Sequence, residues 1–438
     1  MKHIVIIGNG ISGVTAARHI RKHSSNKITI ISSETDHFFS RTALMYIYMG
    51  HMKYENTKPY EDNFWKKNRI DLLRDHVQSV DTKLKTLTLL SGNTIQYDSL
   101  IIASGSKSNK FGWPGQELSG VQGLYSFQDF ERMEQTTRGI DRAVIVGGGL
   151  IGIEMAEMLL SRKIAVTMLV RESEFWSNVL PLQEANMISR HIRSHHVDLK
   201  LKTELKEIQS DDRGSIKSII TNHDEIIPCQ FVGLTVGVSP AVDFLTDSGI
   251  ECKRGILVNE YLETNIPDVY ALGDCVERTY DVPGRKNIEQ VWYTGRMMGE
   301  VVAQTICGNK TKYEPGPWFN SAKFFDIEYQ TYGVVSNVLG KDESEFYWEH
   351  ESAAKCMHLV WDKQTQQFLG INSFGIRLRH ECFDRWLRDK QSIQFVLDHL
   401  KEANFDPEFF DRHEDEIIKQ FSETFSNLKA NSKVMSTL

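Results

Sequence analysis

Two sets of three glycines in this chain have the spacing of a turn that binds phosphate. Both sets follow the pattern G-x-G-x-x-G, and they are Gly8, Gly10 and Gly13, then Gly147, Gly149 and Gly152. In such a turn the first glycine permits the sharp bend, the second lets a pyrophosphate approach the backbone, and the third lets the helix pack closely on the strand. The helix then offers free N–H groups and the positive end of its dipole to the phosphate. The two sets therefore predict two dinucleotide-binding sites.

The elements that must position the first set can be recognised around it. Residues 3–7 are an apolar run that predicts a strand, residues 14–22 have a helical pattern, and residues 28–31 predict a second strand. Glu34 follows, 21 residues after Gly13, where an acid can accept hydrogen bonds from both hydroxyls of an adenosine ribose. The glycine spacing alone is weak evidence, because an ordinary βαβ turn can also be rich in glycine. Strand, helix and acid together favour a dinucleotide site.

The second set repeats this arrangement. A helix is expected over residues 150–161 and a strand over residues 165–170. Val170 stands where a ribose-binding acid often lies, and Arg171 and Glu172 follow it. Glu172 favours NADH through the ribose diol, whereas Arg171 would accept the 2′-phosphate of NADPH. NADH is the favoured coenzyme, with NADPH as the alternative.

Two further strands end in residues that suit a cofactor. Residues 100–103 lead into Ser104 and Gly105, and such a joint often approaches a ligand closely. Residues 269–272 place Gly273 and Asp274 at a carboxyl end, where an open parallel sheet binds ligands. An ordinary turn aspartate is the alternative for Asp274.

A helix is expected from about Gln290 to Thr305, with its N-terminus toward the same crevice. The strand at residues 231–236 ends in a turn at Gly237. Arg41 is the one charged residue in the run 38–52. It is interpreted either as a residue that starts a helix or forms a salt bridge, or as a contact to a cofactor ring or phosphate.

The remaining segments are less specific. Residues 70–90 alternate apolar and polar side chains and predict short antiparallel strands, with a turn at residues 91–93. From Tyr313 the chain is dense in aromatic residues and alternates like an antiparallel sheet, and residues 381–429 have a helical, charged pattern.

Composition limits the function. A net charge of −7 argues against general affinity for nucleic acid or anionic membranes. The chain has 438 residues and six cysteines, and no two cysteines form CxxC or CxxxxC. This argues against a zinc knuckle, a cysteine-ligated cluster and a local redox disulfide, and no metal site is predicted. No signal peptide or membrane span is recognised, so a cytoplasmic protein without a membrane or nucleic-acid partner is expected.

Five motifs in one order resemble the FAD- and NAD(P)H-dependent pyridine nucleotide–disulfide oxidoreductase superfamily. They are GNGISG with Glu34, IIASGS, GGGLIGIEMAE, LTVGVSP and DVYALGDC. The resemblance implies an α/β fold with two Rossmann-like domains, the NAD domain inserted in the FAD domain, and an α+β C-terminal domain, often at a dimer interface. The expected divisions are 1–118 with 241–313 for FAD, 119–240 for NAD(P)H, 314–376 for the C-terminal sheet and 377–438 for a helical extension.

The resemblance also assigns residues. The FAD contacts it implies are Gly8, Gly10, Gly13, Glu34, Gly273 and Asp274, and those to NAD are Gly147, Gly149, Gly152 and Glu172. Glu154 matches a glutamate that lies close to nicotinamide and flavin in several relatives. FSRTAL, with Arg41, looks like the arginine-containing segment of rubredoxin and ferredoxin reductases, the flavin part of nitrite reductase and apoptosis-inducing factor. The lysine that pairs with the helix glutamate in several of those proteins is replaced near Tyr46.

These features imply hydride transfer from NADH to FAD, with Glu154 and Arg41 as catalytic candidates. Ser104, Gly105, Gln290 and Gly237 are expected as further cofactor contacts. Because no redox cysteine follows Glu34, electrons are expected to leave singly to a small iron–sulfur protein or rubredoxin, and a homodimer fits the family. Two alternatives stay open. One is a thiol, persulfide or peroxide reductase that uses a distant cysteine such as Cys275 or Cys382. The other is a non-enzymatic sensor of NADH.

Overall fold

A computed structural model describes residues 1–425. The last part of the expected helical extension, residues 426–438, lies outside the described residues. Contacts within the chain divide it into two compact units. The first holds residues 1–171 and 202–315, and the second holds residues 172–201 and those from 316 onward. Each unit is described by itself, and the four predicted domain boundaries stay predictions.

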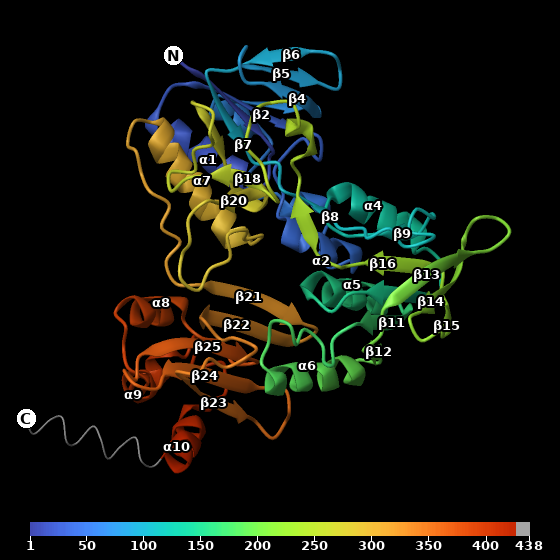
Figure 1. The fold of residues 1–438 in the computed structure, drawn as a ribbon, viewed down its shortest axis with the longest axis vertical. Helices are drawn as coiled ribbons and strands as arrows, with labels where there is room; N and C mark the ends of the chain where they lie inside the picture. The colour runs from blue at the N-terminus through green and yellow to red at the C-terminus, as the bar shows by residue number, and fades with distance from the viewer. Residues whose placement is uncertain (426–438) are drawn as a thin grey trace, which may run out of the picture. The chain divides into compact units, whose positions relative to one another are not determined.

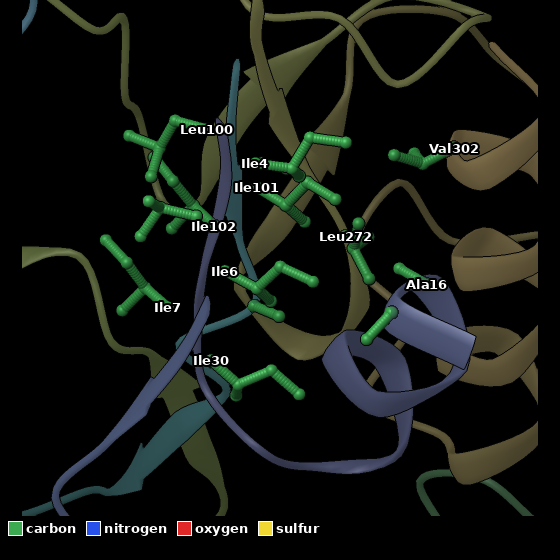
Figure 2. Packing of buried hydrophobic residues seen from close by; sticks show 14 of the residues in the cluster. Ile4, Ile6, Ile7, Ala16, Ile30, Leu100, Ile101, Ile102, Leu272 and Val302 are labelled. Carbon is green, nitrogen blue, oxygen red and sulfur yellow. The ribbon is translucent and has the colours of Figure 1, made fainter. Parts of the chain in front are cut away.

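The first sheet of the first unit is parallel and contains the N-terminal strand. Its order is β19-β7-β1-β2-β3, and β2 and β7 are labelled in Figure 1. The strands are β1 (His3–Ile7), β2 (Lys27–Ser32), β3 (Ile70–Arg74), β7 (Ser99–Ile102) and β19 (Val269–Ala271). Helices α1 (Ile11–His23) and α7 (Trp292–Ile306) pack against each other beside it. Fully buried branched residues such as Ile6, Ile101 and Val302 fill the space between sheet and helices (Figure 2). A parallel sheet covered by helices needs such continuous apolar strands, which is why the sequence shows these strands clearly.

One prediction for this region is partly wrong. Residues 70–74 do not join an antiparallel meander, because β3 pairs with β2 in parallel. An edge strand has one partly exposed face, so its side chains alternate as they do in a meander. The antiparallel part is confirmed for β4 (Val77–Asp81), β5 (Thr86–Leu89) and β6 (Thr94–Gln96), with the expected turn before β6.

A second parallel sheet carries the other glycine set. Within the first unit its strands run in the order β11-β10-β16-β9. They are β9 (Val121–Gln122), β10 (Arg142–Val146), β11 (Ala165–Val170) and β16 (Phe231–Leu234). Helix α5 (Leu150–Ser161) and strand β11 have the predicted bounds. The antiparallel strands β13 (Leu205–Ser210), β14 (Ile216–Thr221) and β15 (Ile226–Pro228) complete this part.

Short elements connect these sheets. The strand pairs are β8 (Ser106–Ser108) with β17 (Val238–Pro240), and β18 (Ile256–Val258) with β20 (Val276–Arg278). The helices are α2 (Leu44–Tyr48), α3 (Asn63–Lys67) and α4 (Phe127–Thr136).

The second unit is built on one antiparallel sheet. Its order is β21-β22-β25-β24-β23. The strands are β21 (Phe319–Phe324), β22 (Ile327–Gly333), β23 (Glu343–Glu349), β24 (Cys356–Asp362) and β25 (Phe368–Phe374). The helices are α6 (Leu182–Ser194), α8 (His380–Arg388), α9 (Ile393–Asp398) and α10 (Glu414–Thr424), and β12 (Asp198–Leu201) also belongs here. Two parallel nucleotide-binding-type sheets and a C-terminal antiparallel sheet confirm the predicted fold class.

Candidate cofactor site

A cavity of about 660 Å³ opens at the carboxyl ends of the first parallel sheet. Strands β1, β2, β7 and β19 all end at its wall, which is the position where open α/β sheets bind ligands. Its size lies within the range of cofactor and small-molecule pockets. Nine predicted site residues line it: Gly8, Gly10, Glu34, Arg41, Ser104, Gly105, Glu154, Asp274 and Gln290.

The glycine turn between β1 and α1 fits a pyrophosphate. Gly8 has φ of +107°, and a Cβ there would overlap the carbonyl of Ala103. A Cβ on Gly13 would overlap the carbonyl oxygen of Gly8. Gly10 differs, because a Cβ on it would meet nothing within 4 Å. Gly10 therefore leaves open space at the N-terminus of α1, where unpaired helix N–H groups favour an anion.

Glu34 and Arg41 form an ion pair on the cavity wall. Both carboxylate oxygens accept hydrogen bonds from the Arg41 guanidinium, at 2.6 Å each, and Oε1 also accepts one from the Phe127 N–H at 2.8 Å. Burial lowers the pKa of Arg41, but the Glu34 carboxylate outweighs this effect and the net pKa is raised. Arg41 starts a short 3-10 helix, Arg41–Ala43. The structural interpretation of Arg41, which starts a helix and forms a salt bridge, is confirmed, and its contact to a cofactor stays a prediction.

Tyr125 is a cavity residue that the sequence did not reveal. Its hydroxyl donates to Asp274 Oδ2 at 3.1 Å and accepts a hydrogen bond from the Ser106 N–H at 2.9 Å. Burial raises the pKa of Asp274, although the Tyr125 bond opposes this. The segment around Tyr125 contains Gly120 and Gly123 but not the G-x-G-x-x-G spacing, and only the tertiary fold brings it to the end of β19. Gly273, just before Asp274, has φ of +78° and lies against Ser12.

Helix α7 begins slightly later than predicted. It starts at Trp292 with Val291 as its N-cap, so Gln290 precedes the helix. The reason is the pairing of Glu289 with Arg285 and Arg278, which holds this stretch as a loop. Gln290 Nε2 donates to Ser106 Oγ at 2.8 Å, which fixes its side chain at the cavity.

The second glycine turn has the same local geometry as the first. Gly149 is the N-cap of α5, and a Cβ there would also meet nothing within 4 Å. Gly147 and Gly152 lie against Thr235. Glu172 follows β11 at the start of the second unit, and Gly237 lies between β16 and β17 with φ of +89°. The turn fits a second pyrophosphate, and the contacts of Glu172 and Gly237 to a coenzyme stay predictions.

Glu154 connects the two motifs. It belongs to α5, the helix of the second glycine turn, yet it lines the cavity of the first, together with Leu150 and Ile151. Burial, with a smaller contribution from Glu157, raises the pKa of Glu154 to about 7. The second motif thus presents to the cavity a carboxyl group that can carry a proton at neutral pH.

A Glu154→Gln variant should be more stable than the wild type at high pH only. The folded-state pKa lies above the usual 4.5 of a glutamate, so stability falls as pH rises from about 4.5 to about 7 and stays lowered above it. A glutamine side chain at this position stays neutral, so it does not lower the stability of the folded state as pH rises. We expect a gain of about 2–3 kcal/mol in unfolding free energy at about pH 8 and almost none at about pH 4.5. Urea unfolding at both pH values measures it, and an equal gain at both would contradict the assignment.

The sequence profile of the pyridine nucleotide-disulphide oxidoreductase family matches residues 2–299. The chain belongs to this family. Its cofactors are FAD and NAD(P)H, which the two glycine turns and the cavity fit. A ferredoxin–NAD(P)(+) reductase of Sphingomonas sp is 29% identical over 341 residues, covering 76% of this chain and 81% of the relative. An NADH-rubredoxin oxidoreductase of Clostridium acetobutylicum is 31% identical over 316 residues, covering 71% of this chain and 76% of the relative.

Among solved structures, an NAD-dependent persulfide reductase from A. fulgidus superposes with a TM-score of 0.84 at 22% identity. The superposition covers 98% of this chain and 83% of the persulfide reductase chain. This likeness shows the shared fold. No helix within residues 1–425 is long and apolar enough to cross a membrane.

Proposed function

We propose that this family member takes electrons from NADH and passes them singly to a small electron-carrier protein of the rubredoxin or ferredoxin type. Two bacterial relatives are named as reductases of ferredoxin and of rubredoxin. One observation carries the proposal. Helix α5, which follows the second dinucleotide motif, reaches the cavity of the first motif, and its Glu154 lies in the cavity wall.

The residues of the chain have separate tasks in this reaction. FAD, when bound, supplies the chemistry of accepting hydride and releasing electrons. The turn at Gly10 receives the pyrophosphate, and Asp274, held by Tyr125, provides an acceptor oxygen inside the cavity. The start of α7 beside Gln290 provides a positive dipole end, which stabilises negative charge nearby. Glu154 can hold or release a proton near neutral pH.

The rival thiol chemistry needs a reactive cysteine at the cavity. No cysteine within residues 1–425 belongs to the cavity wall. Cys275 is fully buried, its thiol lies 3.3 Å from the Leu272 carbonyl oxygen, and burial raises its pKa to about 11. Such a thiol is a poor nucleophile. Carrier reduction is therefore favoured over disulfide or persulfide reduction.

A Cys275→Ala/Cys382→Ala double variant is expected to keep NADH-dependent carrier reduction within about twofold of the wild type, because neither thiol takes part. Cys275 is next to the cavity residue Asp274, and Cys382 is the other cysteine named for the thiol alternative. The measurement is steady-state reduction of rubredoxin or ferredoxin. A loss of more than about tenfold in the folded variant would favour the thiol alternative.

The carrier assay itself tests the proposal. NADH, enzyme and a purified rubredoxin or ferredoxin should give carrier reduction that saturates with carrier concentration. A reduced protein that persists for minutes with every carrier would support the sensor alternative. The proposal also includes a preference for NADH over NADPH, a homodimer and a cytoplasmic location. Parallel assays with both coenzymes test the preference, and sedimentation tests the homodimer.

A further inference from the structure

Two histidines and an aspartate converge in the second unit, in residues that no part of the flavin chemistry uses. His191 and His195 are one turn apart at the end of α6, and Asp326 lies in the turn between β21 and β22. Both Nε2 atoms face the same oxygen, Asp326 Oδ1, at 2.7 Å from His191 and 3.1 Å from His195. The donor atoms of the three side chains all lie within 4.8 Å of one another.

We propose that His191, His195 and Asp326 bind one divalent transition-metal ion, of which Zn²⁺ is the best match. Zn²⁺ takes imidazole nitrogen and carboxylate oxygen at about 2.0–2.2 Å in a tetrahedron, so its ligand atoms lie about 3.3 Å apart. The two histidine–aspartate separations, 2.7 and 3.1 Å, lie close to this value, and the two histidine nitrogens lie within 4.8 Å of each other. Two histidines, one carboxylate and a water molecule complete the tetrahedron.

The surrounding residues already hold the ligands in place. The His195 ring stacks on Phe325 with a centroid distance of 4.3 Å and an angle of 6° between the planes. The His191 side chain is 10% exposed, and the backbone of Phe324 forms a hydrogen bond with its ring. Ligand rings fixed in this way lose little entropy when a metal binds.

A second cluster provides a contrast. His350, His413 and Glu416 also lie within reach of one another. However, the Lys355 ammonium is 3.0 Å from His413 Nε2, where it would repel a metal ion. The cysteine spacing predicted no metal site. The His191-x-x-x-His195 spacing was the signal available, and Asp326 could not be paired with it, since 131 positions separate His195 from Asp326.

The test uses full-length holoprotein without an affinity tag, stripped of metal with a chelator. Zn²⁺ is titrated in competition with a chromophoric chelator. The wild type should bind one equivalent, and His191→Ala should lower the affinity by at least about 100-fold, since even outer-shell substitutions cost 10–100-fold. Asp326 is 73% exposed, so Asp326→Ala tests the same site with little effect on the fold. His196→Ala is the matched control, because His196 is exposed and lies outside the cluster.

Two results would overturn the site. One is a wild-type protein whose affinity for Zn²⁺ is no higher than that of the Asp326→Ala variant. The other is a loss of affinity in His196→Ala or His350→Ala as large as that in His191→Ala. Melting temperatures of the chelated variants show whether each is folded. In the wild type, Zn²⁺ should raise the melting temperature, because it ties α6 to the β21–β22 turn.

Discussion

Replacing Gly10 with valine is expected to abolish FAD binding in a protein that stays folded. Gly10 has φ of −69° and ψ of −179°, an extended conformation that valine adopts readily, and its Cβ would meet no protein atom within 4 Å. The added methyl groups occupy the open space at the N-terminus of α1 instead. We expect FAD affinity to fall by at least about 100-fold, or about 2.7 kcal/mol. The flavin absorbance of the purified variant and FAD titration measure the loss, and circular dichroism reports the fold.

Gly149→Val is the matched control for this prediction. Gly149 caps α5 in an extended conformation as well, with φ of −126° and ψ of −176°, and also has open space around its Cβ position. This variant should retain FAD but lose most of its reduction by NADH, because only the second site is blocked. A Gly10→Val protein that keeps its flavin would contradict the assignment of the first turn. A Gly149→Val protein that loses its flavin would contradict the separation of the two sites.

Replacing Glu289 with alanine should strongly destabilise the first unit. Glu289 pairs with Arg285 at 2.6 Å and with Arg278 at 3.4 Å, and the three side chains are 2%, 3% and 0% exposed. Without Glu289 two buried guanidinium groups lose this carboxylate partner, and such losses cost about 3–5 kcal/mol. Gln290 follows directly, so the loop beside the cavity should also loosen. Urea unfolding measures the stability, and FAD titration reports on the loop.

The same helix region offers a control. Glu300 pairs with Arg296 on α7, but their side chains are 40% and 57% exposed. Glu300→Ala should therefore cost less than about 1 kcal/mol. Equal losses of unfolding free energy in the two variants would contradict the claim that burial makes the Glu289 ion pairs important for stability.

The sequence predicted the cavity from local patterns. Both glycine turns and the bounds of α5 and β11 could be predicted, because continuous apolar strands and glycine punctuation leave few alternatives. Asp274 was also found, since the carboxyl ends of parallel strands meet at one edge of a sheet. These features depend on short segments in which local preference and the tertiary fold agree.

The features that the sequence missed depend on distant residues. Tyr125 reaches Asp274 across 149 positions, and no spacing rule relates them. The raised pKa of Glu154 comes from burial, which a sequence pattern does not specify. Strand β3 was misassigned because an edge strand of a parallel sheet alternates like a meander. A salt bridge of Arg41 was predicted, but Glu34 was not named as its partner, although only seven positions separate the two residues.

Anaerobic reduction by NADH tests the central claim most directly. The purified protein should be yellow, and a single equivalent of NADH should bleach its flavin, with no change in the number of free thiols. NADPH serves as the comparison coenzyme. A protein that carries no flavin, a flavin that neither coenzyme reduces, or a second equivalent consumed as new thiols appear would each contradict the account.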